Sequence, residues 1–85
     1  MAEVSRAGKT FTPKQGQYLA FIHAYTRLHR RPPAETDMQQ YFRVSPPSVH
    51  HMVVTLERAG FIRKQPRLAR SIELLVDAKS LPELL

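Results

Sequence analysis

Only three residues, at positions 43–45, separate two segments whose apolar side chains recur at the spacing of a helix. In the segment before this gap, Met38 and Phe42 are four residues apart, which places them on one helix face. The segment after the gap carries the apolar residues of one buried helix face: Val49, Met52, Val53 and Leu56. A connection of three residues between two helices is typical of a helix-turn-helix. The gap therefore favours a fold in which two short helices pack closely against each other.

A longer helix is predicted upstream of this pair, over residues 13–30. The run TPKQ at residues 12–15 supplies a threonine N-cap, a proline at the first helical position and a glutamine that can bond back to the cap. Pro32 and Pro33 end the helix, because a residue that precedes proline is disfavoured in the helical conformation. The apolar arc of this helix holds Tyr18, Phe21, Ile22, Tyr25 and Leu28.

Similar signals bound the two helices that follow. The helix at 35–42 has only two turns and needs neighbours to pack on. Ser45 and Pro46 repeat the cap-plus-proline start, and Gly60 stands where a left-handed C-terminal cap is needed. The third helix is therefore predicted over residues 46–59.

Two short strands are predicted after Gly60. Phe61 and Ile62 form the first strand, and the alternating Ile72, Leu74 and Val76 form the second. Residues 63–70, which include Pro66, join them as a basic hairpin loop. The predicted class is mainly α (α+β), a winged helix-turn-helix in which three helices precede a two-stranded β-hairpin wing. This domain spans residues 11–76.

The two ends of the chain lie outside that predicted domain. Residues 1–10 are polar and are expected to form a flexible N-terminal arm. In the tail, residues 77–85, Ser80 and Glu83 have the spacing of a capping box and predict a short helix. Three tail leucines have no evident place in the core and are the predicted contact of a homodimer: Leu81, Leu84 and Leu85.

Charge points to a polyanionic partner. Thirteen Lys and Arg against seven Asp and Glu give a net charge of +6, which favours nucleic acid through counterion release. The basic residues cluster, because residues 4–34 hold six of them and no acid. No apolar run reaches the roughly 18 residues of a membrane span, and no signal peptide is recognisable, so a cytoplasmic protein without a membrane partner is expected.

Composition also argues against catalysis, cofactors and metal binding. The chain has no cysteine, which excludes disulfides, thiolate zinc sites and a cysteine nucleophile. The four histidines, His23, His29, His50 and His51, are not spaced with a carboxylate as a tetrahedral metal site. Paired carboxylates, a Gly-rich phosphate loop and an activated nucleophile are also lacking, so we expect no enzyme activity and no cofactor.

Several runs of the sequence resemble the N-terminal DNA-binding domain of LexA-type repressors over residues 11–75. They are TPKQ at 12–15, PP at 32–33, SP at 45–46, LERAGFI at 56–62 and ARSIEL at 69–74. The run SPPSV at 45–49 is also similar to the recognition helices of DtxR-type and MarR-type regulators. The resemblance implies a winged helix that binds double-stranded operator DNA and acts as a transcriptional repressor.

The sequence also departs from the LexA pattern. Where that family continues into a serine/lysine protease domain that cleaves its own linker and dimerises the repressor, this chain ends, so no self-cleavage is expected. Arg43 stands where relatives often have glycine or asparagine, and a left-handed conformation would cost it about 1 kcal/mol.

The third helix supplies the predicted base contacts. With Val49 inward, the helical wheel turns Pro47, His51, Val54, Thr55 and Arg58 outward, with Ser48 and His50 beside them. The resemblance implies contacts to operator bases from Ser45, Pro47, Ser48, His50 and His51. Serine, threonine and histidine can bond to base edges, and Val54 can contact a thymine methyl group.

Predicted backbone contacts come from three places. The wing supplies Arg63, Lys64, Arg67 and Arg70, of which Arg67 and Arg70 suit the minor groove. The first helix supplies Arg27, Arg30 and Arg31, and the third helix supplies Arg58. The sequence thus predicts a homodimeric regulator that binds double-stranded DNA. The alternative is a winged-helix interaction module for an acidic protein, while RNA binding is disfavoured because the aromatic residues are committed to the core.

Overall fold

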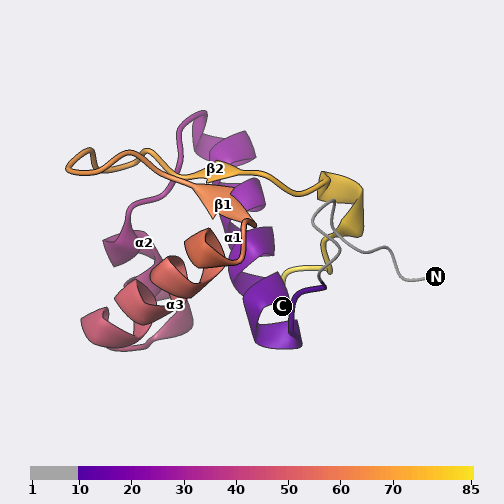
Figure 1. Cartoon of the computed structure of the whole chain (residues 1–85), viewed down its shortest axis with the longest axis horizontal. Helices are drawn as coiled ribbons and strands as arrows, with labels where there is room; N and C mark the ends of the chain where they lie inside the picture. Colours follow the sequence, from indigo (N-terminus) through magenta and orange to yellow (C-terminus); the bar gives the residue numbers. More distant parts are fainter. Residues whose placement is uncertain (1–9) are drawn as a thin grey trace.

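The computed structural model describes residues 10–85, and the predicted arm lies outside them except for Thr10. Three helices come first in the chain and a small antiparallel hairpin follows (Figure 1). The elements in order are α1 (Pro13–His29), α2 (Glu35–Phe42), α3 (Pro46–Arg58), β1 (Ile62–Arg63), β2 (Glu73–Leu74) and the 3-10 helix η1 (Ala78–Ser80). The predicted winged helix-turn-helix is confirmed.

Helix α1 begins with the predicted cap and ends one residue earlier than predicted. The Thr12 hydroxyl accepts from the Gln15 amide at 3.1 Å, and the Gln15 side chain accepts from the Thr12 amide at 2.9 Å. Arg30, at φ 61°, is the left-handed C-cap. Leu28 is 77% exposed, so its assignment to the apolar arc is wrong. The last turn of α1 extends beyond the elements that cover the rest of the helix.

The helix-turn-helix has the predicted three-residue connection. Helix α2 has the predicted bounds, and Arg43 after it adopts the left-handed conformation at φ 56°. Its amide donates to the carbonyl of Gln39, which completes the end of α2. The chain therefore accepts the steric cost of a left-handed arginine, about 1 kcal/mol, to keep the turn short.

The C-terminus of α3 carries the predicted glycine cap. Gly60, at φ 84°, donates its amide to the Glu57 carbonyl, and the Phe61 amide donates to the Leu56 carbonyl, both at 3.0 Å. This pair of bonds is a Schellman motif, in which the left-handed residue favours glycine. The helix proper ends at Arg58, and Ala59 is its C-cap.

The hairpin is shorter than predicted. Its register pairs Ile62 with Leu74 and Arg63 with Glu73, so each strand has two residues. Arg63 belongs to β1 and not to the loop, while Phe61, Ile72 and Val76 lie outside the strands. Left-handed residues at Arg67 and Arg70 turn the chain within the loop, and the Ser71 hydroxyl closes its base through the Gln65 amide at 2.9 Å.

The core lies between the three helices and the hairpin. Its fully or nearly buried apolar residues are Tyr18, Leu19, Phe21, Ile22, Met38, Val49, Val53, Leu56, Phe61, Ile62 and Ile72. Tyr18 stacks on Phe42 of α2 with a ring-centroid distance of 4.2 Å, and burial raises the pKa of Tyr18 above its usual value. Tyr25, predicted to be a core residue, is only half-buried at the margin.

The C-terminal tail belongs to the domain. Leu81 and Leu84 are half-buried against the core, so the expectation that they lack a place in it is wrong. The short helix η1 begins after Asp77 and ends at Ser80. The capping-box spacing had instead predicted a helix that starts at Ser80. Sequence patterns missed the docking because it depends on α1 residues far away in the chain.

Two α1 residues hold this tail. The Gln17 side chain donates to the Glu83 carbonyl and accepts from the Leu85 amide, both at 2.9 Å. A Cβ atom on Gly16 would lie 3.0 Å from Cγ of Pro82, so glycine leaves the space that this proline fills. Leu85 itself is 91% exposed.

Within residues 10–85, none of the helices combines the length and the apolar character needed to cross a membrane.

Candidate nucleic-acid interface

Helix α3 presents one polar face to solvent. Its inward face is fixed by Val49, Val53 and Leu56, all fully buried. The predicted base-contacting residues that are exposed are Ser45, Pro47, Ser48, His50 and His51. Val54 and Thr55 are half-buried, farther along the helix. The structure thus brings these seven residues together on α3 and at its N-cap.

The first turn of α3 is ordered by its cap. The Ser45 hydroxyl accepts from the Ser48 amide at 3.3 Å and lies 3.0 Å from the Ser48 hydroxyl. Farther along, the Thr55 hydroxyl donates to the His51 carbonyl at 2.9 Å. These bonds leave acceptor lone pairs on the hydroxyl groups, so the groups can still accept from a base.

A groove separates the N-terminal turns of α1 and α3. It is lined by Lys14, Tyr18, Val44, Pro47, Ser48, His51 and Met52. Lys14 is exposed, and the reasoning from sequence did not assign it to the site. Its charge was visible in the sequence, but its position beside α3 depends on how the two helices pack.

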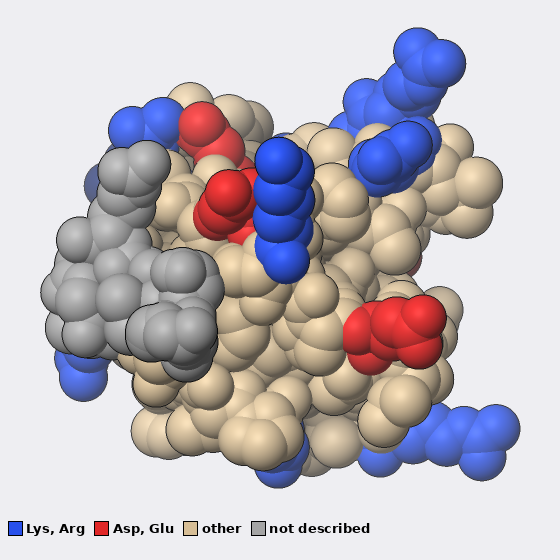
Figure 2. All heavy atoms as spheres, turned by 90° about the vertical axis from the view of Figure 1, so that its right-hand side faces the viewer, with Lys and Arg blue, Asp and Glu red and all other residues tan. Residues whose placement is uncertain are grey.

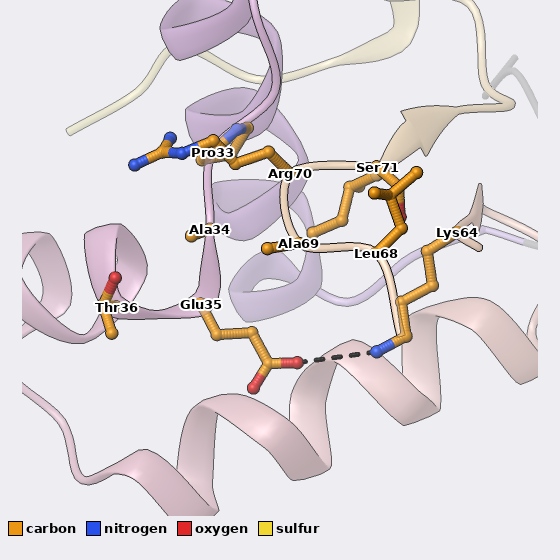
Figure 3. Close-up of a pocket in the computed structure, with 10 residues that line it drawn as sticks. Pro33, Ala34, Glu35, Thr36, Lys64, Leu68, Ala69, Arg70 and Ser71 are labelled. Atoms are coloured by element: carbon orange, nitrogen blue, oxygen red, sulfur yellow. Dashed lines mark ion pairs between the residues drawn. The ribbon is translucent and has the colours of Figure 1, made fainter. Parts of the chain in front are cut away.

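Glu35 links α3 to the wing. One of its oxygens, Oε2, lies 3.6 Å from Lys64 Nζ (Figure 3). The same oxygen lies 3.4 Å from His50 Nδ1. His50 is exposed, whereas Glu35 and Lys64 are half-buried. Pairs of this length near the surface contribute about 1 kcal/mol or less, so a phosphate group can replace Glu35 as the partner of either side chain.

The four predicted wing cations have different surroundings. Arg63 bonds across the hairpin to Glu73 Oε1 at 2.7 Å, and Lys64 approaches Glu35. Arg67 is exposed and pairs with no acid among the residues that the structure describes. Arg70 instead turns toward the body of the domain, and Figure 3 shows its side chain extending past Pro33.

The hydrogen bond to Tyr25, together with the nearby Asp37 carboxylate, outweighs burial and raises the pKa of Arg70 above its usual value. The Arg70 guanidinium therefore stays charged at neutral pH.

The remaining predicted backbone contacts divide into two groups. Arg58 is exposed in the last turn of α3. Arg27, Arg30 and Arg31 are exposed too, but the C-terminal turns of α1 lie on the other side of the hairpin from α3 (Figure 1). The structure therefore does not bring these three arginines together with the exposed face of α3.

Among residues 10–85, the positive charge is not gathered on the face that carries η1. Figure 2 shows mostly uncharged surface there, with Lys and Arg side chains mainly at its margins. Among the described residues, His, Asp and Glu side chains do not form a group of three that could hold a metal ion. The α3 face, with the wing beside it, remains the surface whose chemistry suits a nucleic acid.

Comparison with known proteins agrees with this geometry. The protein-family model that describes the LexA DNA binding domain matches residues 8–71 of the chain. The chain is 33% identical to the LexA repressor of Thermosipho melanesiensis over 73 residues, which cover 86% of this chain and 37% of that repressor. It is also 33% identical to the LexA repressor of Thermosipho africanus over 67 residues, covering 79% and 34%. The chain thus spans about a third of the length of these relatives. It belongs to the LexA DNA-binding domain family.

Proposed function

We propose that the protein is a transcriptional repressor that binds double-stranded DNA in a sequence-specific manner. The observation that carries this proposal is the position of the exposed polar face of α3 next to a wing whose Arg67 has no acidic partner among residues 10–85. A helix of this width fits the major groove, and a cationic loop beside it suits the backbone or the minor groove. The relatives that carry the name LexA repressor support the repressor role.

In this proposal, base recognition comes from the α3 face. Hydroxyl and imidazole groups bond to base edges, and Val54 contacts a thymine methyl group. The residues assigned to base edges are Ser45, Pro47, Ser48, His50, His51, Val54 and Thr55. Because Val54 and Thr55 are half-buried, they contribute less than the exposed residues of the first two turns.

Backbone binding comes from cations around that face. Arg67 and Arg58 are free to meet phosphates, and Lys14 joins them from the groove between α1 and α3. Arg63 and Lys64 bind phosphate by exchanging it for Glu73 and Glu35. The arginines at the end of α1 are left out because they lie away from α3.

Selection of bound sequences from random duplex DNA tests the proposal. We expect one enriched motif, bound with a steep dependence of affinity on salt concentration. Retention of all sequences alike would contradict sequence-specific recognition. Failure to bind any duplex, combined with binding to an acidic protein, would support the interaction module instead.

Arg67 gives a direct test of the wing. Arg67→Ala is expected to weaken binding to the selected duplex and to unrelated duplexes by the same factor. It should also flatten the plot of log affinity against log salt by about 0.9, the value for one lost phosphate contact. Lys79→Ala is the matched control, because it removes one positive charge from exposed η1. A slope that Arg67→Ala leaves unchanged would remove the wing from the interface.

We also propose that two copies bind one two-fold DNA site, since closed two-fold pairs are the commonest protein assemblies. Sedimentation of the complex with the selected duplex is expected to give two chains per duplex, and one chain would contradict it. Because Leu81 and Leu84 pack on the core, deleting the tail would also destabilise the domain. Leu85→Asp avoids this, since Leu85 is exposed, and it should lower the mass of a tail-mediated dimer toward a monomer.

A further inference from the structure

Arg70 differs from the other wing cations in where its guanidinium lies. Its Nη1 atom is 3.0 Å from Asp37 Oδ2, 3.1 Å from the Tyr25 hydroxyl and 3.3 Å from the Pro32 carbonyl. These acceptors belong to α2, to α1 and to the connection between them. The side chain is 32% exposed, so the pair with Asp37 is partly shielded from solvent. One nitrogen thus ties the wing to both helices.

Asp37 also has a second role in α2. Its Oδ2 atom accepts from the Ala34 amide at 2.7 Å, which satisfies one of the free amides at the start of the helix. Ala34, the N-cap residue, has no side-chain acceptor for the other amides of the first turn, so this bond is the side-chain bond that caps α2. A single carboxylate oxygen of Asp37 therefore accepts from the first residue of the helix-turn-helix and from Arg70 of the wing. Charge-assisted hydrogen bonds of this kind are stronger than neutral ones.

The wing needs such a tie because its ladder is short. Each strand has two residues, and a two-stranded hairpin is at best marginally stable without further contacts. Arg70 is itself in the left-handed conformation, at φ 60°, which costs a residue with a side chain about 1 kcal/mol. The buried Ile72 fixes the chain two residues later. Two side-chain contacts then orient the loop between β1 and Arg70 relative to the helices. They are the bonds of the Arg70 side chain and the longer contact of Lys64 with Glu35.

We propose that Arg70 is a positioning residue for DNA binding, and that its bonds to Asp37 and Tyr25 hold the wing at the angle to α3 that lets Arg67 reach DNA. This inference rests on the proposed function. It replaces the expectation that Arg70 enters the minor groove, because the Nη1 atom of its guanidinium is directed at acceptors within the domain.

Two substitutions separate positioning from direct contact. Asp37→Asn removes the charge that holds Arg70, so it would tighten DNA binding if Arg70 were a phosphate contact and weaken it if Arg70 positions the wing. Arg70→Lys keeps the positive charge but lacks the planar guanidinium. We expect each change to weaken binding to the selected duplex by about three- to tenfold. In either background, Arg67→Ala should no longer change the salt slope.

Glu73→Gln is the matched control. Like Asp37→Asn, it removes one negative charge, but it leaves Arg70 with all its partners because Glu73 pairs with Arg63. It should bind DNA as well as the parent or more tightly. Tighter binding by Asp37→Asn, or parental affinity and salt slope for Arg70→Lys, would overturn the proposal. If Asp37→Asn fails to fold, Arg70→Lys still tests the proposal.

The position of the wing can also be measured without DNA, which keeps this inference distinguishable from the proposed function. The chain has no cysteine, so Leu68→Cys at the exposed wing tip accepts a single spin label. We expect a fixed pattern of paramagnetic broadening on α3 amides in the parent and a weaker, more dispersed pattern with Arg70→Lys. An unchanged pattern would show that Arg70 does not position the wing, whatever the protein binds.

Discussion

Replacing Leu56 by alanine is expected to lower the free energy of unfolding by about 2–5 kcal/mol, a large part of the stability of a small domain. Leu56 is 0% exposed and shares the inward face of α3 with Val49 and Val53. Its carbonyl also accepts the Phe61 amide in the cap that ends α3. Truncation would leave a cavity at the point where α3 joins the hairpin. Urea denaturation followed by circular dichroism measures the loss.

Glu57→Ala is the neighbouring control, since Glu57 is exposed and should change stability by no more than about 0.5 kcal/mol. The comparison also tests the DNA interface. The inward face of α3 and the face proposed to read bases are opposite sides of one helix, so the position of either fixes the other. If Leu56→Ala and Glu57→Ala had equally small effects, the rotation of α3 would be wrong, and with it the assignment of the histidines.

Helix ends were predictable because their causes are local. Thr12 and Gln15 satisfy each other three residues apart, and Gly60 is needed by the turn that immediately follows α3. The left-handed Arg43 shows a local preference overridden by the short connection between α2 and α3. The orientation of α3 was also predictable, since periodicity alone places Val49 inward.

Features that depend on distant contacts were missed. Leu28 fits the apolar period of α1, yet no element of the described part of the chain covers it at the end of the helix, where it is exposed. Leu81 and Leu84 are half-buried because Gly16 and Gln17, more than sixty residues earlier, hold the neighbouring Pro82 and Glu83 against α1. No local pattern in the tail sequence predicts this contact with α1.

The candidate site likewise has a part that local sequence patterns predict and a part that depends on distant contacts. The exposed face of α3 was predicted from periodicity and its base contacts from the resemblance, whereas the surroundings of each wing cation depend on its partner. Arg70 and Arg67 look alike in the sequence, but the partners of Arg70, Tyr25 and Asp37, lie 45 and 33 residues away. Charge clustering can locate a basic wing, and only packing shows which of its cations are free.

The second large effect is expected from the double variant His50→Gln, His51→Gln. Both histidines are exposed on α3, and His50 is 62% exposed although it lies near Glu35. Glutamine can bond to a base edge but cannot gain a proton. We expect the variant to relax preference at one or two base pairs by about 1–3 kcal/mol each, with the fold unchanged.

The same variant should lose the pH dependence of DNA binding. An imidazolium ion beside phosphates is favoured by its charge, so we expect the affinity of the parent to rise as pH falls from about 8 to about 5.5. The matched control is His23→Gln, His29→Gln, which changes two histidines on α1 and should keep the parental profile. Affinities for the selected and a scrambled duplex across this range decide the matter. If the α3 variant keeps both the pH profile and the preference of the parent, these histidines do not read DNA, and recognition falls to Ser48 and its neighbours in the first turn.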